Sequence, residues 1–250
     1  MKLLQIIIPA YNAERFIKDT LDALQAQTFM DWTCVIVDDG STDNTLSIAQ
    51  ECTQNDARFS VYTQPNKGVS AARNFGMFQI TEDAIWTIFL DADDIYEKDA
   101  LAILLFTTAR LWCPALGTPL RRIDENSQWL DGYDTQVAEE PIRAMDPHIE
   151  EYPLERFKVT PGVIGTPGSW IFRSDWVRML EGYDETMSAA EDSDFLMRSC
   201  MRSPLIVMYT NVIRYRRYPG QTSQRLDVVQ KGADRMTEKH GPWGTPGETS

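Results

Sequence analysis

The chain has 250 residues, of which 43% are apolar and 24% are charged, and its formal net charge is −13. This apolar share argues against intrinsic disorder, and 14 glycines with 13 prolines are too few for a low-complexity chain. Nucleic acids and anionic membranes repel so acidic a protein unless its cations gather locally. We therefore expect one large globular domain, or a core domain with an elaborated second half, that binds no nucleic acid. Such a chain needs a local arginine or a divalent cation to bind a phosphate ligand.

The cysteines and the apolar runs of the sequence favour a cytoplasmic location. The four cysteines contain no CxxC pair, and the chain has only two histidines. This pattern favours reduced thiols and argues against a disulfide framework or a Cys- or His-based metal site. No apolar run reaches the roughly 20 residues of a membrane span, and the first run ends at Pro9 without a signal-peptide cleavage site. The sequence thus predicts a cytoplasmic protein with no transmembrane segment, although peripheral membrane contact stays open.

The first half of the chain alternates strand-like and helix-like segments. Strands are expected at residues 3–8, 33–37, 59–62 and 85–90. Helices are expected at 13–27, with Asn12 as the N-cap, from about 42, and at 70–79. Near-continuous apolar strands that alternate with helices predict an α/β fold with a mostly parallel, Rossmann-like sheet and helices on both faces.

The second half has a weaker pattern. We expect a hairpin over 121–130 that turns at 124–127, a strand at 171–172 and a helix at 175–180 capped by Ser174. A further helix is expected at 191–201 and a strand at 205–209, whereas the acidic, proline-interrupted residues 131–160 receive no assignment. Residues 241–250 are expected to form a loose tail.

Polar residues follow three of the expected strands. These groups are Pro9-Ala10-Tyr11-Asn12, Asp38-Asp39-Gly40-Ser41 and Asp91-Ala92-Asp93-Asp94. Ligands of open parallel sheets bind beyond the carboxyl ends of the strands, so we expect the three groups to meet at one edge. Crowded carboxylates there would suit Mg²⁺ or Mn²⁺. Each group alone has residues that are common in turns. Their shared position at the ends of three strands is what favours a binding site.

Four strings carry a resemblance to a known family: IIIPAYN (6–12), VIVDDGSTD (35–43), NKGVSAARN (66–74) and FLDADD (89–94). In this order and spacing they resemble an inverting glycosyltransferase of family two, which has the GT-A fold. The resemblance is strong over about residues 3–105. It resumes more weakly at 182–185, 191–192 and 214–223. It implies a nucleotide-sugar-binding half over 1–106 and an acceptor-binding half of the same domain over 107–240.

The resemblance assigns donor-binding roles in the first half. Pro9, Ala10 and Tyr11 would wall the pocket of the nucleotide base, and Asp39 would accept hydrogen bonds from the base. Arg73 would lie near the nucleotide and supply the cation that this acidic chain needs. The structural alternatives are a core tyrosine at position 11 and a surface arginine at position 73.

The string Asp91-Ala92-Asp93 resembles the DxD motif of these enzymes. Asp93 would hold Mg²⁺ or Mn²⁺ at the donor diphosphate, Asp91 would lie at the ribose or the metal, and Asp94 could share either task. Many relatives read Arg-x-His-Pro-Gly where this chain has Tyr218 in place of the histidine, a possible metal ligand. Coordination would then rest on Asp93, diphosphate and water, or metal dependence would be weaker.

The basic segment around Tyr218 has two interpretations. Arg216, Arg217 and Ser223 either contact the diphosphate or belong to a solvated basic strand. On the acceptor side, Trp170 either stacks on a sugar or packs in the core.

The acidic pair Glu191-Asp192 resembles the acceptor-side acids of the family, with Asp192 as the general base. The alternative is a helix N-terminus, where acids suit the helix dipole. We therefore expect transfer of a sugar from a nucleotide-diphosphate donor, with UDP favoured, to a glycan or lipid-linked acceptor. The expected setting is cell-surface polysaccharide or glycan assembly. The rival functions are a catalytically inactive nucleotide-sugar-binding protein and a nucleotidyltransferase.

Overall fold

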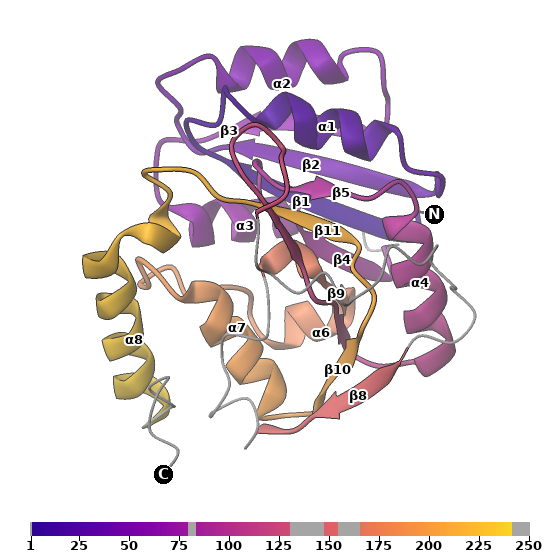
Figure 1. Cartoon of the computed structure of the whole chain (residues 1–250), viewed down its shortest axis with the longest axis vertical. Helices are drawn as coiled ribbons and strands as arrows, with labels where there is room; N and C mark the ends of the chain where they lie inside the picture. Colours follow the sequence, from indigo (N-terminus) through magenta and orange to yellow (C-terminus); the bar gives the residue numbers. More distant parts are fainter. Residues whose placement is uncertain (1, 80–83, 131–147, 155–165, 242–250) are drawn as a thin grey trace.

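The computed structural model describes residues 2–79, 84–130, 148–154 and 166–241 (Figure 1). The tail expected at 241–250 lies outside the described residues except for Gly241. Most of the unassigned segment 131–160 lies outside them as well. Among the described residues no helix is long and apolar enough to span a membrane.

Eight strands form the central sheet in the order β3-β2-β1-β4-β9-β6-β10-β8. The strands β1 to β4 are mutually parallel, whereas β9 is antiparallel to β4 and β6, and β8 is antiparallel to β10. Their bounds are β1 Leu4–Ala10, β2 Trp32–Asp38, β3 Phe59–Thr63, β4 Trp86–Phe89, β6 Ala115–Gly117, β8 Ile149–Tyr152, β9 Trp170–Arg173 and β10 Leu205–Met208. The predicted α/β fold with a mostly parallel sheet is confirmed.

A smaller sheet has the order β5-β11-β7, with bounds Ile95–Tyr96, Ile213–Arg216 and Arg121–Ile123. The helices are α1 Ile17–Gln25, α2 Thr45–Thr53, α3 Val69–Phe78, α4 Ala100–Leu111, α6 Ser174–Met179, α7 Glu191–Cys200 and α8 Leu226–His240. Two short 3₁₀ helices, η2 Pro167–Ser169 and η3 Thr222–Gln224, complete the described elements. In Figure 1, α1 and α2 lie on one side of the sheet, and α3, α6 and α7 lie on the other.

Side chains of β1 point alternately to the two faces of the sheet, and helices cover both faces. Leu4, Ile6 and Ile8 are fully buried in the cluster that includes residues of α1, α2 and α4. Ile7 belongs to the opposite cluster, with residues of α6, α7 and α8. Gly76 of α3 packs on this second face, where a Cβ atom would lie 2.5 Å from Cγ2 of Ile7. A glycine is therefore needed to bring α3, which carries Arg73, this close to β1.

Two predicted helix caps are wrong. Asn12 has a φ of 49° and its side-chain oxygen accepts a hydrogen bond from the Thr42 backbone N–H at 2.9 Å. Asn12 therefore joins the loops after β1 and β2, and α1 begins only at Ile17. Ser174 is the first residue of α6 and makes no capping bond, because its hydroxyl pairs with that of Thr87 on β4 at 2.8 Å.

Several elements predicted in the second half of the chain lie close to their observed positions. Helix α7 and strands β9 and β10 lie close to their predicted positions, and the predicted turn at 124–127 leads to a single bridge between Ile123 and Trp129. The strand pairings of β8 and β11 and the long helix α8 were not predicted. Residue 106, the predicted end of the donor half, lies inside α4, so a helix spans this division. The assignment of donor and acceptor roles to the two halves stays a prediction.

Candidate functional site

The three polar groups that follow β1, β2 and β4 lie at one edge of the sheet, as predicted. Strand β1 pairs in parallel with both β2 and β4, and Ala10 at its end pairs with Asp38. Asp39 follows β2 directly, and Asp91 follows β4 after one intervening residue. The carboxyl ends of three neighbouring strands therefore bring residues from distant parts of the chain together.

Asp39 is buried, with 3% of its surface exposed, and its carboxylate orders the loop that enters α3. One oxygen accepts hydrogen bonds from the Gln64 side chain at 2.7 Å and the Lys67 N–H at 2.9 Å. The other accepts the Gly68 N–H at 2.8 Å. Its contact with a nucleotide base stays a prediction, and any base contact would share a carboxylate that already accepts three bonds.

The predicted base-pocket residues differ in exposure. Pro9 and Ala10 are buried within β1. Tyr11, in contrast, is 51% exposed, so it is not a core tyrosine and its ring is open to a ligand. Their contact with a base is a prediction that the fold permits.

The three aspartates after β4 have different surroundings. Asp94 is fully buried and accepts hydrogen bonds from the Arg216 N–H and the Thr166 hydroxyl, both at 3.1 Å. Asp94 therefore holds β11 in place and is not free for the ligand roles considered for it. Asp93 is partly buried, and its burial together with the charge of Asp91 raises its pKa to about 6.

Tyr218 lies beside Asp93, at the position where many relatives have a histidine. A hydrogen bond joins the two side chains and acts to lower the pKa of Asp93. Burial, and next the charge of Asp93, raise the pKa of Tyr218 above its usual value, so its hydroxyl stays protonated. The ring packs on Phe16 with centroids 4.7 Å apart. Tyr218 thus supplies a hydroxyl donor to Asp93.

Arg216 is a structural residue, which corrects one predicted ligand contact. Its side chain is 1% exposed. Its guanidinium donates to the Asp93 carbonyl, the Ser127 hydroxyl and the Asp19 carboxylate, each at 3.0 Å. A buried arginine with these partners cannot reach a diphosphate. Ser223 is exposed and pairs with the Tyr215 hydroxyl at 2.9 Å.

Among the described residues, no group of three or more His, Cys, Asp or Glu side chains is arranged so that it could hold a metal ion on protein ligands alone. Asp91 and Asp93 do offer hard carboxylate oxygens, and the pKa of Asp93 is raised by burial and next by the charge of Asp91, which a cation would offset. The residues present fit an ion that shares its coordination with a ligand's own oxygens.

Arg73 occupies the centre of the site and is not a surface arginine. Its side chain is 3% exposed and donates to Asp91 at 2.8 Å and to Glu191 at 2.9 Å. Its guanidinium carbon lies 4.8 Å from the ring centroid of Tyr183. Burial opposes its charge, but the neighbouring carboxylates keep the pKa of Arg73 above its usual value. The sequence marked the 182–185 segment but did not indicate this role of Tyr183.

Asp192 lies in the first turn of α7, next to Glu191. Burial, and then the charge of Glu191, raise the pKa of Asp192 to about 7, while Arg73 and the Ser193 N–H act in the opposite direction. A carboxyl group with a pKa near neutral pH is suited to general acid–base chemistry. Glu191, which directly precedes the predicted base, pairs with the same arginine as Asp91, and the role of Asp192 as general base stays a prediction.

Asp194, two residues further, is a structural anchor for α8. It is fully buried and accepts from Arg198 at 2.7 Å, from Lys239 at 2.7 Å and from His240 at 2.7 Å. Lys239 also pairs with Asp184 at 2.7 Å. These bonds tie the end of α8 to α7 and to the 182–185 segment, a link that no local sequence pattern indicated.

Trp170 does not offer a face to a sugar. It is 1% exposed in β9 and stacks on Phe172 with centroids 6.1 Å apart. The core interpretation of this residue is therefore correct.

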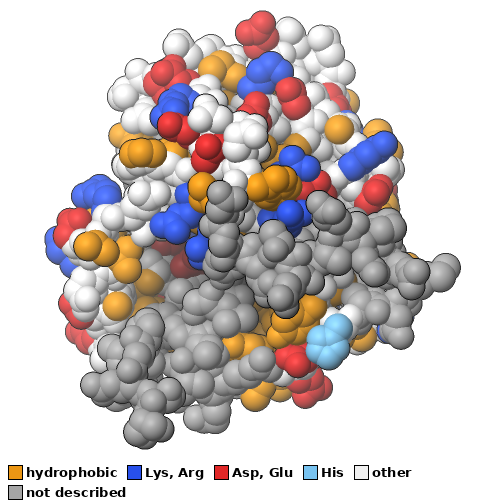
Figure 2. Space-filling view, in the orientation of Figure 1, with side chains coloured by type: hydrophobic (Ala, Val, Ile, Leu, Met, Phe, Trp, Pro, Cys, Tyr) orange, Lys and Arg blue, Asp and Glu red, His pale blue; other side chains and the backbone are white. Residues whose placement is uncertain are grey.

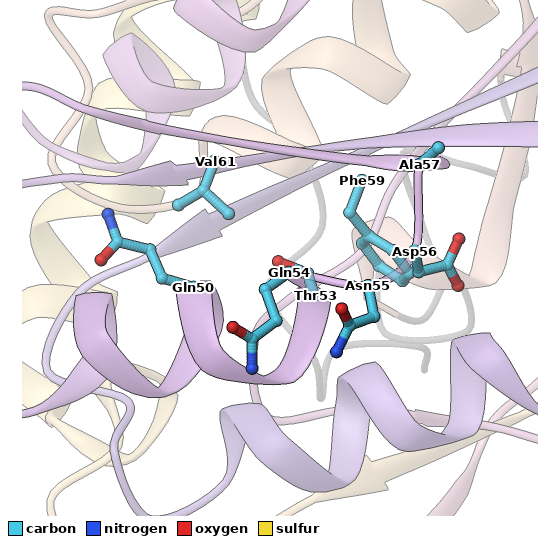
Figure 3. Close-up of a pocket in the computed structure, with 8 residues that line it drawn as sticks. All are labelled: Gln50, Thr53, Gln54, Asn55, Asp56, Ala57, Phe59 and Val61. Atoms are coloured by element: carbon cyan, nitrogen blue, oxygen red, sulfur yellow. The ribbon is translucent and has the colours of Figure 1, made fainter.

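A separate hollow of about 480 Å³ lies between the end of α2 and the start of β3 (Figure 3). Its lining includes Gln50, Gln54, Phe59 and Val61. Because β3 begins there, the hollow lies toward the amino ends of the parallel strands, away from Asp39 and Asp91. It is not part of the candidate site.

Comparison with protein families identifies residues 5–179 as a match to the model of Glycosyl transferase family 2. Chondroitin synthase of Escherichia coli is 29% identical over 239 residues, which are 92% of this chain and 31% of that protein. Glycosyltransferase GlyA of Streptococcus pneumoniae is 36% identical over 99 residues, 40% of this chain and 14% of that protein. Hyaluronan synthase of Pasteurella multocida is 36% identical over 103 residues, 41% of this chain and 10% of that protein. The chain thus spans about a third or less of the length of these relatives.

Solved structures of Staphylococcus aureus TarS have a similar fold. Residues 1–349 of TarS in complex with UDP-GlcNAc match with a TM-score of 0.71 at 21% identity, covering 95% of this chain and 67% of the TarS chain. The complex with UDP matches with a TM-score of 0.69 at 22% identity, covering 95% and 66%. These matches show a GT-A fold. The family match over residues 5–179, more than half of the chain, establishes that the chain belongs to Glycosyl transferase family 2.

Proposed function

We propose that this chain transfers a sugar from a UDP-sugar to a hydroxyl of a glycan or lipid-linked acceptor, with inversion, in polysaccharide or glycan assembly. The observation that carries the proposal is that one buried guanidinium, that of Arg73, contacts both Asp91 of the DxD-like string and Glu191, the predicted acceptor-side residue. Donor-side and acceptor-side acids therefore belong to one site. The names of the relatives, which include chondroitin and hyaluronan synthases, support a role in polysaccharide assembly, and the UDP and UDP-GlcNAc ligands of TarS support a UDP-sugar donor.

In the proposed reaction Asp192 is the general base. It takes the proton of the acceptor hydroxyl while that oxygen bonds to the anomeric carbon, and the bond from this carbon to the diphosphate oxygen breaks. The nucleoside diphosphate leaves with the bonding electrons. A base with a pKa of about 7 is ionised in a large fraction of molecules at neutral pH and can still bind a proton.

We propose Mg²⁺ or Mn²⁺ as the cofactor, held by Asp93 together with oxygens of the donor diphosphate. When bound, the ion would neutralise negative charge on the leaving diphosphate. Asp91 pairs with Arg73, and its charge helps to raise the pKa of Asp93, which suits the predicted contact with the ribose or the metal. The Tyr218 hydroxyl competes for Asp93, and we expect weaker metal dependence than a histidine there would give.

We also propose Arg217 as a diphosphate contact. Of the three candidates in this segment, Arg216 is buried on structural partners and Ser223 is paired with Tyr215. Arg217 follows β11 and directly precedes Tyr218. Figure 2 shows several Lys and Arg side chains across the middle of this face, consistent with the local cations that an acidic chain needs to bind a phosphate ligand.

The unpaired cysteines support a reducing compartment, because Cys34, Cys52, Cys113 and Cys200 are all free thiols. We infer a cytoplasmic location from these thiols.

The proposed function is tested by thermal unfolding in the presence of a panel of sugar nucleotides, because a ligand that binds only the folded state raises Tm. The best stabiliser is then assayed for UDP release, with Mn²⁺ and with chelator. Binding with turnover supports the proposal, and binding without turnover by the wild type indicates the inactive binding protein. Release of pyrophosphate from a nucleoside triphosphate and a sugar phosphate would instead indicate a nucleotidyltransferase.

A further inference from the structure

We propose that Arg73 is a positioning residue that couples the donor-side DxD motif to the base, and that it does not bind the nucleotide directly. This inference rests on the proposed function and assigns a different role from the nucleotide contact that the family resemblance implies. It follows from the way in which the guanidinium is surrounded.

Both terminal nitrogens of the Arg73 guanidinium donate hydrogen bonds to protein carboxylates. One terminal nitrogen donates to Asp91 at 2.8 Å and the other to Glu191 at 2.9 Å. The ring of Tyr183 lies 4.8 Å from its central carbon, and the buried Nε has no hydrogen-bond partner among the described residues. With 3% of the side chain exposed, a nucleotide could reach the guanidinium only by displacing one of these partners.

The contacts join elements that are far apart in the chain. Asp91 follows β4, Glu191 begins α7 and Arg73 lies on α3. Asn74, the next residue of α3, strengthens the same junction, because its side chain pairs with both the N–H and the carbonyl of Tyr183 at 2.8 and 2.9 Å. Two consecutive side chains of α3 therefore hold the acceptor-side segment and the first turn of α7 against the donor edge.

Arg73 also acts on the charge of the neighbouring base. The charged and titratable groups that influence Asp192 include Glu191 on its own helix, Asp91 after β4, Arg73 on α3 and Tyr183 in the 182–185 segment. Both carboxylates favour the protonated base, whereas Arg73 is the cation among these groups and favours the ionised base. Arginine suits this position because its planar fork pairs with two carboxylates at once, which a single ammonium group cannot do with the same geometry.

Two substitutions are expected to act on the base in opposite directions. Arg73→Lys weakens the ion pairs with Asp91 and Glu191 and moves the positive charge away from Asp192. The acidic limb of the pH profile of turnover should therefore shift to higher pH by about one unit, and turnover should recover toward pH 9. Glu191→Gln removes the adjacent negative charge, so the limb should shift to lower pH. In both variants the affinity for UDP, measured by calorimetry, should stay within about threefold of the wild type.

The matched control is Arg58→Lys. Arg58 also pairs with a carboxylate, that of Asp56 at 2.6 Å, and its guanidinium lies 4.0 Å from the Trp32 ring centroid, but it precedes β3 at the opposite edge of the sheet. This control should leave the pH profile and UDP affinity unchanged. If Arg73→Lys weakens UDP binding by tenfold or more with no change in the pH profile, the inference is overturned and Arg73 is a nucleotide ligand.

A measurement without turnover separates this inference from the proposed function. Carboxylate ¹³C NMR of the folded proteins, assigned with Asp192→Asn, gives the pKa of Asp192 in the wild type and in each variant. Opposite shifts in Arg73→Lys and Glu191→Gln support the coupling even if no UDP-sugar is turned over, an outcome that would refute the proposed function alone. If Arg73→Lys does not fold, the Glu191→Gln shift decides, and an unchanged Asp192 pKa in that variant refutes the coupling.

Discussion

Substitution of Asp192 by Asn tests the chemical step most directly. Asparagine keeps the size of the side chain but cannot accept the acceptor proton. General bases contribute about 10² to 10⁴ in rate, so we expect turnover at pH 8 to fall by at least ~100-fold, which corresponds to about 2.7 kcal/mol. UDP affinity should change little, because the proposed role of Asp192 is to contact the acceptor hydroxyl and not the nucleotide.

The pKa of Asp192 gives the expected pH dependence. With a value of about 7, the base is ionised in about 90% of molecules at pH 8 and about 10% at pH 6. Turnover of the wild type should therefore fall about tenfold between these pH values at saturating substrate. The assay is UDP release from the UDP-sugar identified by thermal screening, measured across this range.

Stability provides a second measurement that needs no activity. The pKa of Asp192 is raised on folding from an ordinary value of 3.8 to about 7, so its ionised form is less favourable in the folded than in the unfolded chain. Protonated Asp192 is therefore favoured at low pH, and the wild type loses stability relative to Asp192→Asn as pH rises through about 4 to 7. The Tm of the variant should exceed that of the wild type by more at pH 8 than at pH 5.

A matched control is Asp175→Asn, since Asp175 lies in the first turn of α6 with a half-exposed carboxylate paired to Arg173. It should retain turnover. Near-normal turnover of Asp192→Asn with loss in Glu191→Gln would place the base one residue earlier. Retention of activity in both Asp192→Asn and Glu191→Gln would refute the acceptor-side interpretation. Wild-type turnover that does not change between pH 6 and 8 would contradict a general base with a pKa of about 7.

Three further predictions concern the surrounding residues. Asp39→Ala removes three hydrogen bonds from the loop that enters α3, and calorimetry should show UDP affinity reduced at least tenfold in a folded protein; unchanged affinity would remove Asp39 from the donor site. Asp93→Ala should abolish the extra Tm increase that Mn²⁺ gives to the UDP complex, whereas Tyr218→His should enlarge it, and a normal Mn²⁺ response in Asp93→Ala would refute the proposed metal ligand. Asp194→Asn leaves cations at a buried site without their carboxylate, so the free energy of unfolding at pH 7 should fall by about 3 kcal/mol in urea denaturation. Because the pKa of Asp194 is lowered on folding, this loss should shrink as pH falls below about 4, and an equal loss at all pH values would contradict the ionic origin.

The sequence by itself determined the alternating strands and helices in the first half of the fold. Strands β1, β2 and β4 are short, apolar runs that are buried inside the sheet. Each is followed by residues that break the apolar pattern. Neighbouring parallel strands have their carboxyl ends at the same edge of the sheet. The sequence alone therefore predicts that Asp39, Asp91 and Asp93 share one site. The family resemblance rests on the same strings.

Tertiary structure alone decided how these residues are used. Arg73 meets Asp91 and Glu191, which are 18 and 118 residues away, and nothing in the local sequence of α3 specifies those partners. Arg216 and Trp170 looked available for ligands, but burial assigns them to the core. The physical reason is range: periodicity and turn chemistry act over a few residues, whereas ion pairs, desolvation and the resulting pKa of a carboxylate depend on which distant elements pack against it.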